Sequence, residues 1–374
     1  MSLSSEQSRF SRRRLLRAAG MAFMAAILAV TGVAVVGAVR AQRRHDPATA
    51  LGTTGGHQEA VRATITPTSA PSSPGSGAPG APPASFPPPR PSRFGSVDPS
   101  PAQLLSGAQP YVPSGWTASV HVIPSGGHRR EYLTIQPDHA HGPLPVVILL
   151  HGRFMTADGI LATTRLAAQV GPAVLVVPEG WHRSWDAGRC CGIAYTHHSR
   201  DTAFVHAALD QVLASTPAAD PSQVYAVGFS NGGRMAYRLA CELPGVLAGI
   251  VVAEAVPVLP CPSLRPLDIA VIAQADDPLL SVRPGQAPVW IDGFKEPTVS
   301  QTVDAWRALD GCGAGRSSAA GVASVHAWSC AAGSTFEYVR YPGGYHSWRE
   351  PAGATPGATD VAVAMIRGRE RTTL

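Results

Sequence analysis

From about residue 117 onward, the chain alternates short apolar runs, typical of buried strands, with amphipathic stretches, typical of helices. Residues 145–150 form a continuous apolar run, which indicates a central parallel strand, and residues 117–123 and 130–135 alternate like a hairpin. Further strands are predicted over 173–178, 224–227, 249–253, 268–273 and 335–341, and helices over 161–169, 202–213, 234–239, 303–309 and 360–367. This order predicts an α/β fold with a mostly parallel central sheet and helices on both faces.

The N-terminal segment has the pattern of an export signal. Ser11-Arg-Arg-Arg-Leu-Leu-Arg17 precedes an uncharged run over residues 18–39. The order of the basic residues resembles a twin-arginine signal, and about 20 apolar residues also suffice to span a bilayer. Residues 1–44 are therefore predicted to be either a cleaved export signal or an N-terminal membrane anchor. The excess of Arg before the run places the rest of the chain outside the cytoplasm, secreted or anchored.

Residues 45–112 are rich in Pro, Ser, Gly, Ala and Thr and lack apolar periodicity. A segment of this composition cannot bury a core, so we predict a disordered linker. Residues 113–374 are then predicted to be the folded domain.

The net charge of +5 does not describe the folded part of the chain. Residues 1–44 carry eight Arg and one Glu, a charge of +7, which leaves −2 for the remainder. A folded part without a basic excess argues against a nucleic-acid partner.

The pattern Gly228-Phe229-Ser230-Asn231-Gly232 lies between a predicted strand and a predicted helix. A strand that turns directly into a helix strains the corner residue and needs small neighbours, which the two glycines supply. The corner hydroxyl is then exposed at a helix N-terminus, where the helix dipole favours developing negative charge. Ser230 is therefore predicted to be a nucleophile. Asn231, which follows it, is the only asparagine of the chain.

A nucleophilic serine needs a base and a carboxylate that orients the base, and in this strand–turn–helix context they follow the serine in the order acid, then histidine. His346 lies in a glycine-flanked loop after the last predicted strand, and it is the predicted base. Asp276 and Asp277 follow the strand over 268–273. Asp277 is preferred as the acid because the Asp-Pro step fixes a turn there, and Asp276 stays an alternative.

Two N–H groups are predicted to stabilise an oxyanion. The N–H of Asn231 lies at the start of the helix, and that of Arg153 lies in the loop after residues 145–150. His151 precedes this loop and is predicted to shape it rather than to react.

Together these segments resemble the α/β-hydrolase esterases that include polyhydroxybutyrate depolymerases and feruloyl esterases. The resemblance covers residues 117–348 and rests on five motifs: His151-Gly152, Trp185-Asp-Ala-Gly-Arg-Cys-Cys-Gly192, Gly228-Phe-Ser-Asn-Gly-Gly233, Asp277-Pro278 and Gly343-Gly-Tyr-His-Ser-Trp348. The segment 185–192 is the most specific of them. The resemblance implies an α/β-hydrolase catalytic domain, a triad of Ser230, Asp277 and His346, and oxyanion donors at Asn231 and Arg153.

Six cysteines behind an export signal predict disulfides, and six cysteines allow 15 pairings. The resemblance implies the short-range pairs Cys241–Cys261 and Cys312–Cys330. Cys190 and Cys191 are left as a vicinal pair or as free thiols. No spacing of Cys and His resembles a zinc site, and we expect neither a metal nor a cofactor.

The expected activity is that of a serine esterase that hydrolyses carboxylic esters through an acyl-enzyme. Small-molecule or oligomeric esters are the expected substrates, of short-chain, hydroxyalkanoate-oligomer or feruloyl/acetyl type. Trp185 and Trp348 are predicted to contact the substrate, with core packing as the alternative. A peptidase or acyltransferase of the same fold, or a surface binding module without turnover, stay open as alternatives. The oligomeric state is not predicted.

Overall fold

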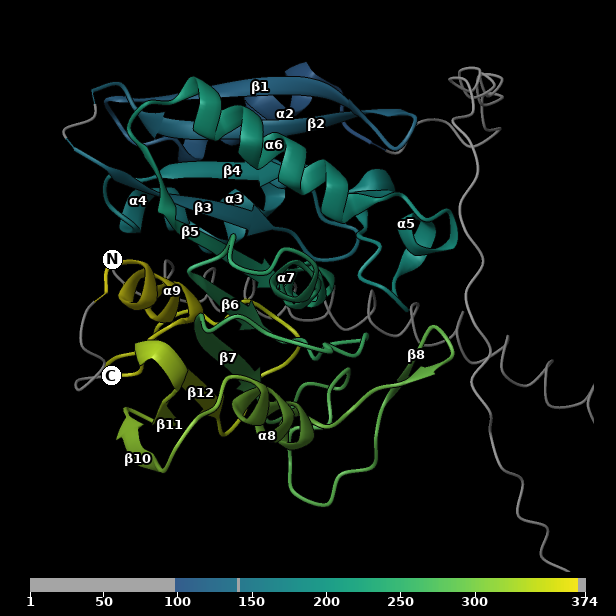
Figure 1. The fold of residues 1–374 in the computed structure, drawn as a ribbon, viewed down its shortest axis with the longest axis vertical. Coiled ribbons are helices and arrows are strands. Elements are labelled where there is room, and N and C mark those ends of the chain that lie inside the picture. Colours follow the sequence, from purple (N-terminus) through teal and green to yellow (C-terminus); the bar gives the residue numbers. More distant parts are fainter. Residues whose placement is uncertain (1–97, 140–141, 369–374) are drawn as a thin grey trace, which may run out of the picture. The chain divides into compact units, whose positions relative to one another are not determined.

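The computed structural model describes residues 98–139 and 142–368, so the predicted N-terminal segment and most of the predicted linker lie outside the described residues. A ten-stranded sheet forms its centre (Figure 1). In spatial order the strands are β1 (Trp116–Ser125), β2 (His128–Pro137), β4 (Val174–Pro178), β3 (Leu144–Leu150), β5 (Ala219–Phe229), β6 (Gly249–Ala253), β7 (Asp268–Gln274), β12 (Thr335–Tyr341), β11 (Ala323–Ser329) and β10 (Gly315–Ala320).

The middle of the sheet is parallel and its two borders are antiparallel. Strands β4, β3, β5, β6, β7 and β12 run parallel to one another. The predicted hairpin of β1 and β2 is present and joins β4 in antiparallel orientation, and β11 and β10 continue antiparallel from β12. Parallel strands end at a common edge, so the loops that follow β3, β5, β6, β7 and β12 gather there.

The helices are α2 (Pro101–Ala108), α3 (Ala157–Thr164), α4 (Leu166–Gln169), α5 (Gly192–Thr196), α6 (Asp201–Ser215), α7 (Asn231–Glu242), α8 (Val299–Leu309) and α9 (Ala358–Ile366), with 3₁₀ turns η1 (Gln109–Tyr111), η2 (Trp181–Arg183) and η3 (Ala331–Gly333). A small hairpin of β8 (Trp290–Ile291) and β9 (Phe294–Lys295) lies outside the sheet.

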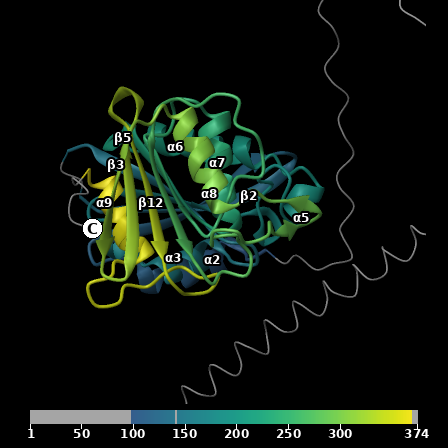
Figure 2. The same cartoon turned by 90° about the horizontal axis from the view of Figure 1, so that it is seen from below.

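The sheet is covered on both faces because its buried strands alternate their side chains between two cores. In β3, Ile148 belongs to the core built with α6, α7 and α8, whereas Val147 and Leu149 belong to the core built with α2, α3, α4 and α9. Figure 2 shows the same two groups of helices on opposite sides of the strands. The predicted class, an α/β-hydrolase fold with a mostly parallel sheet, is confirmed.

The folded part begins earlier than predicted. Helix α2 lies in the stretch predicted as linker, yet Leu104 and Ala108 are fully buried in the core with α3 and α9. Its start carries a capping box between Ser100 and Gln103, with Pro101 at the first helical position. The boundary at residue 113 was therefore wrong, because a capped helix can bury an apolar face without a long apolar run.

Cys241 pairs with Cys261 and Cys312 pairs with Cys330, as predicted, and Cys190 pairs with Cys191. The first bond ties the end of α7 to the loop after β6, and the second ties the end of α8 to the turn before β12. None of the helices within the described ranges is both long and apolar enough to cross a membrane, and residues 18–39 lie outside those ranges.

Candidate active site

Ser230 forms the corner between β5 and α7. It has φ 54° and ψ −120°, a conformation that few residues other than glycine adopt. The flanking glycines make the corner sterically allowed. A Cβ on Gly228 would lie 2.2 Å from the carbonyl oxygen of Gly232, and a Cβ on Gly232 would lie 2.2 Å from that of Leu150. The Gly-x-Ser-x-Gly pattern thus forms the sharp turn that the sequence predicts.

His346 lies between Ser230 and Asp277. Its Nε2 is 2.7 Å from Oγ of Ser230, and its Nδ1 is 2.7 Å from Oδ2 of Asp277. The three residues come from the loops after β5, β7 and β12, so the common edge of the parallel strands brings them together. Asp277 is buried, whereas the side chain of His346 is 14% exposed and Ser230 is half-buried.

Of the two adjacent carboxylates after β7, Asp277 is the one that contacts His346. Asp276 forms an ion pair with Arg283 instead. Oδ1 of Asp277 accepts a hydrogen bond of 2.7 Å from the N–H of Leu279, which fixes the carboxylate in the turn. Burial alone would raise the pKa of Asp277, but the hydrogen bond and charge of His346, together with a hydrogen bond to Glu254, hold it below its ordinary value. Asp277 is therefore ionised at neutral pH.

Gln274, the last residue of β7, holds the loop that carries His346. Its Nε2 donates hydrogen bonds of 2.7 Å and 2.8 Å to the carbonyl oxygens of Tyr345 and Ser347, the residues on either side of the histidine. The ring of Phe229 lies 5.3 Å from the imidazole, centroid to centroid. These contacts orient an otherwise glycine-rich loop.

The loop after β3 packs against the serine corner. A Cβ on Gly152 would lie 2.9 Å from the ring of Phe229, which shows how closely the loop approaches β5. Asn231 begins α7, so its N–H has no acceptor inside the helix. The N–H of Arg153 makes no hydrogen bond within residues 98–139 and 142–368. The assignment of these two N–H groups as oxyanion donors stays a prediction.

His151 is a structural residue of this loop. It is fully buried, its Nε2 accepts a hydrogen bond of 2.8 Å from the N–H of Gly180, and its Nδ1 donates one of 2.8 Å to the carbonyl oxygen of Gly152. This pairing requires the neutral ring, and burial lowers the pKa of His151 to about 4. The expectation that His151 shapes the loop agrees with these contacts.

The side chain of Asn231 has a role that the sequence did not reveal. Its Oδ1 accepts a hydrogen bond of 2.7 Å from the N–H of Trp185, and its Nδ2 donates one of 3.1 Å to the carbonyl oxygen of the same residue. Asn231 is fully buried. The asparagine thereby ties the serine corner to the segment 185–192, and only an amide offers both the donor and the acceptor in this geometry.

Trp185 and Trp348 do not form a substrate surface, and that prediction was wrong. The indole of Trp185 is fully buried and donates a hydrogen bond of 2.8 Å to the carbonyl oxygen of His151. Trp348 is 5% exposed, and its indole donates one of 2.9 Å to Oγ1 of Thr359. Both rings lie in loops next to the site, but each loop folds back and places its tryptophan in the core.

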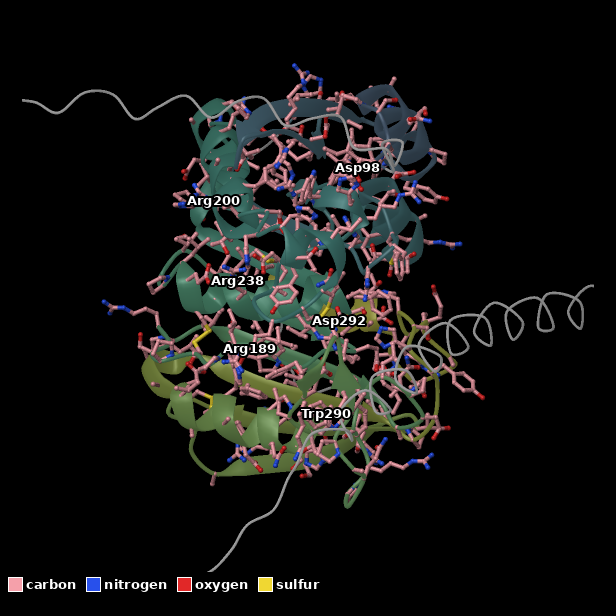
Figure 3. The ribbon with its side chains drawn as sticks, turned by 90° about the vertical axis from the view of Figure 1, so that its right-hand side faces the viewer. Asp98, Arg189, Arg200, Arg238, Trp290 and Asp292 are labelled. Carbon is pink, nitrogen blue, oxygen red and sulfur yellow. A yellow bond between two sulfur atoms is a disulfide. The ribbon has the colours of Figure 1, made fainter. Side chains whose placement is uncertain are left out.

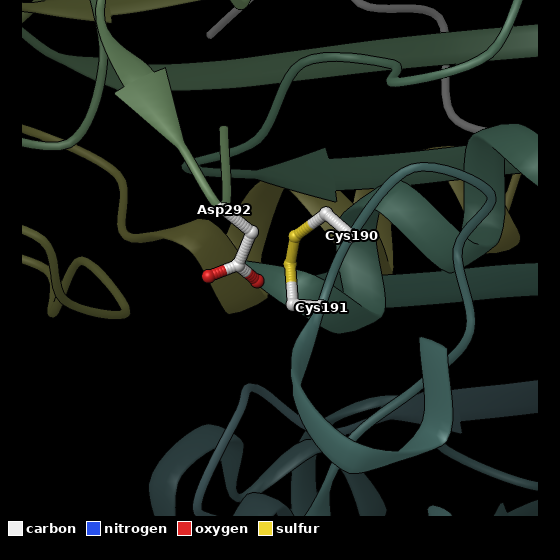
Figure 4. A group of neighbouring side chains, drawn as sticks. All are labelled: Cys190, Cys191 and Asp292. Atoms are coloured by element: carbon white, nitrogen blue, oxygen red, sulfur yellow. A yellow bond between two sulfur atoms is a disulfide. The ribbon is translucent and has the colours of Figure 1, made fainter. Parts of the chain in front are cut away.

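The paired Cys190 and Cys191 lie beside the carboxylate of Asp292, which follows β8 (Figure 4). Arg153 approaches the same carboxylate at 3.5 Å. The sulfurs also receive hydrogen bonds of 3.3 Å from the buried guanidinium of Arg234. The cluster joins the loop after β3, the segment 185–192 and the β8–β9 hairpin.

The chemistry of this cluster does not favour metal binding. A second cluster within the described part of the chain, Asp310 with Cys312 and Cys330, also has the spacing for a cation. In both clusters the cysteine sulfurs are joined in disulfides and offer no thiolate ligand. The absence of a metal stays a prediction.

The strand order, the strained serine corner and the Ser–His–Asp contacts together define the architecture of an α/β-hydrolase. No family model matches the sequence. "Putative esterase NocK" from Nocardia uniformis subsp. tsuyamanensis is 30% identical over 280 residues, which cover 67% of this chain and 80% of that protein. The chain therefore belongs to this family of α/β-hydrolase esterases, and so to the carboxylic ester hydrolases.

Two further relatives match a shorter stretch. A "Poly(3-hydroxybutyrate) depolymerase" from Ralstonia pickettii is 33% identical over 128 residues, 31% of this chain and 26% of its own length. A "Probable feruloyl esterase C" from Aspergillus niger is 31% identical over 122 residues, 30% of this chain and 42% of its own length. Both belong to the groups that the sequence motifs indicate.

Proposed function

We propose that this chain is an exported serine esterase that works through an acyl-enzyme. The observation that supports this proposal best is the pair of 2.7 Å contacts that place His346 between Ser230 and Asp277. A hydroxyl in contact with an imidazole that is itself held by an ionised carboxylate is the arrangement that activates a serine for attack on a carbonyl carbon.

The proposed reaction has two halves. Oγ of Ser230 attacks the ester carbonyl while Nε2 of His346 takes the hydroxyl proton, and the ionised Asp277 stabilises the imidazolium that forms. The N–H groups of Asn231 and Arg153 stabilise the negative charge on the carbonyl oxygen. His346 then protonates the departing alcohol. In the second half, a water molecule gives a proton to His346 and attacks the acyl carbon, and His346 returns this proton to Oγ of Ser230 as the acid leaves.

The surface next to the site favours esters that carry an apolar or aromatic group. Phe154, Trp290 and Tyr345 are 69%, 66% and 72% exposed. Phe154 follows Arg153, Tyr345 precedes His346, and Trp290 lies two residues from Asp292, which contacts Arg153. Figure 3 shows Trp290 and Asp292 on one side of the molecule. Exposed aromatic side chains that neighbour the proposed base and oxyanion loop along the chain would provide a binding surface for rings and alkyl chains.

The proposed substrates are therefore short-chain, hydroxyalkanoate-oligomer or feruloyl and acetyl esters. The names of the relatives, a poly(3-hydroxybutyrate) depolymerase and a feruloyl esterase, agree with this range. The proposed location is outside the cytoplasm, since the disulfide pairs fit an oxidising compartment and residues 1–44 have the pattern of an export segment.

The test compares Ser230→Ala with the wild type and with Ser222→Ala, a control in the same strand that is exposed and far from the corner. Purified proteins are assayed on p-nitrophenyl acetate and butyrate, methyl ferulate and a hydroxybutyrate dimer, and labelled with a fluorophosphonate probe. Ser230→Ala is expected to lower kcat by at least about a thousandfold and to abolish labelling. Ser222→Ala should behave as the wild type. Undiminished hydrolysis by Ser230→Ala would overturn the proposal, and a wild type that labels without hydrolysing any ester would indicate a binding module.

A further inference from the structure

A second carboxyl group, Glu254, lies directly behind the acid of the Ser–His–Asp arrangement. It is the first residue after β6, which lies between β5 and β7, the strands that lead to Ser230 and Asp277. Its backbone has φ 52°, and its N–H donates a hydrogen bond of 3.0 Å to the carbonyl oxygen of Ile272. The side chain is fully buried. A glutamate in this conformation, without access to water, is held in place by its surroundings.

The contacts of this carboxyl group leave one oxygen without a conventional donor. Oε2 accepts a hydrogen bond of 3.2 Å from the N–H of Gln274. Oε1 has no N–H or O–H facing it among the described residues, yet the carboxyl group is in hydrogen-bonding contact with that of Asp277. Two carboxylate oxygens repel each other, and they form a hydrogen bond only when one of them carries a proton.

The surroundings place that proton on Glu254. Burial raises the pKa of Glu254 well above its ordinary value, and the hydrogen bond and the charge of Asp277 raise it further. Burial also acts on Asp277, but the adjacent His346 holds the pKa of Asp277 below its ordinary value. Since the histidine favours the ionised form of one partner alone, the pair consists of a neutral Glu254 and an ionised Asp277.

We propose that protonated Glu254 is a positioning residue that donates a hydrogen bond to Asp277 and so extends the catalytic chain to Ser230–His346–Asp277–Glu254. This inference rests on the proposed function of the first three residues. The hydrogen bond fixes the orientation of the Asp277 carboxylate toward Nδ1 of His346, while the N–H of Leu279 holds its other side. No bond of the substrate is made or broken by Glu254.

The arrangement has a consequence at alkaline pH. When Glu254 loses its proton, a second negative charge lies against Asp277, the hydrogen bond is lost, and repulsion displaces the carboxylate that orients His346. Tyr338 and Tyr341 on β12 also experience the charge of Glu254, and burial raises the pKa of both hydroxyls above their ordinary values, so that they stay neutral to higher pH. We therefore expect the activity to fall at high pH as Glu254 loses its proton.

The experiment compares wild type with Glu254→Gln and Glu254→Leu, with kcat and KM for p-nitrophenyl butyrate measured from neutral to strongly alkaline pH. In Glu254→Gln the amide still donates to Asp277 but cannot ionise, so kcat at pH 7 should stay within about twofold while the alkaline loss moves to higher pH. Glu254→Leu removes the donor and should lower kcat about tenfold with KM within about twofold. Glu179→Gln is the matched control. Glu179 is also buried at the end of a strand, and burial raises its pKa. Its carboxyl group differs in its partner, because its Oε2 accepts a hydrogen bond from the N–H of Ala157.

If Glu254→Leu does not fold, a second measurement tests whether Glu254 is protonated at neutral pH. The infrared spectrum of wild type minus that of Glu254→Gln at neutral pH should contain the carbonyl band of a protonated carboxyl group. Absence of this band, or an alkaline profile of Glu254→Gln identical to that of the wild type, would overturn the inference. If Ser230→Ala is inactive and the Glu254 variants behave as the wild type, the proposed function stands and only this inference fails.

Discussion

Replacement of Gln274 by Leu tests whether His346, the proposed base, depends on a single side chain for its position. Leucine has a similar size and keeps the apolar part of the packing, but it cannot bind the carbonyl oxygens of Tyr345 and Ser347. In the wild type these two bonds, of 2.7 Å and 2.8 Å, hold the backbone on both sides of His346. The ring contact with Phe229, the hydrogen bonds of the imidazole and the buried Trp348 at the end of the loop remain.

The expected magnitude follows from the net value of the two bonds. A hydrogen bond contributes about 1 kcal/mol net, so the variant lowers the preference for the aligned loop by about 2 kcal/mol. Since about 1.4 kcal/mol corresponds to a factor of ten, kcat should fall by roughly 10-fold to 30-fold if the wild-type loop is almost fully aligned. KM should change little, because Gln274 contacts the loop of the base and is itself 1% exposed.

The assay is steady-state hydrolysis of p-nitrophenyl butyrate together with the rate of fluorophosphonate labelling, which reports the activation of Ser230 directly. Gln301→Leu is the matched control, since it removes an exposed capping bond of 2.9 Å to the N–H of Thr298 at the start of α8. The control should lose stability without a change in kcat. A Gln274→Leu variant with wild-type kcat and labelling rate would refute the argument that this side chain aligns His346.

Two further outcomes are expected. Asp277→Asn should lower kcat by roughly a thousandfold or more because the amide cannot stabilise the imidazolium. Asp276→Asn loses only an ion pair with Arg283, so its kcat should stay within about threefold of the wild type. Equal losses of kcat in both variants would contradict the assignment of the acid. Burial lowers the pKa of His151 to about 4 in the folded state, whereas the unfolded chain protonates it near 6.5. The neutral His151 therefore contributes fully to stability above pH 6.5, and this contribution decreases by up to about 3 kcal/mol as the pH falls to 4. The free energy of unfolding, measured in urea across this range, should depend less steeply on pH in His151→Gln, and an unchanged slope would show that the buried ring is not its source.

The sequence predicts the strands of this fold well because their apolar runs are continuous. The strands over 249–253 and 335–341 have the predicted bounds in the structure. The three catalytic candidates also follow from the sequence, since strand ends, glycine turns and the Asp277-Pro278 step are local signals. Their contact with one another then follows from the shared edge of parallel strands.

The errors and omissions concern contacts between segments far apart in the chain. Trp185 belongs to a specific motif on a loop, but its burial depends on Asn231, 46 residues later, which binds its backbone. Helix α2 carried a visible signal, the capping box of Ser100 and Gln103, which the proline-rich composition around it obscured. Glu254 could have been found by the rule that selected Asp277, since an acid at a strand end is a candidate wherever it occurs. What no local pattern reveals is that the two carboxyl groups touch.

The position of His346 after β12 has a consequence for biosynthesis. The imidazole binds a serine 116 residues earlier and an aspartate 69 residues earlier, and it reaches them only after β12 has joined the sheet. A growing polypeptide that has already formed its serine corner therefore lacks the proposed base, His346, until β12 has been synthesised and has paired with β7. We therefore expect a chain that stops before β12 to lack esterase activity even if its serine corner has formed.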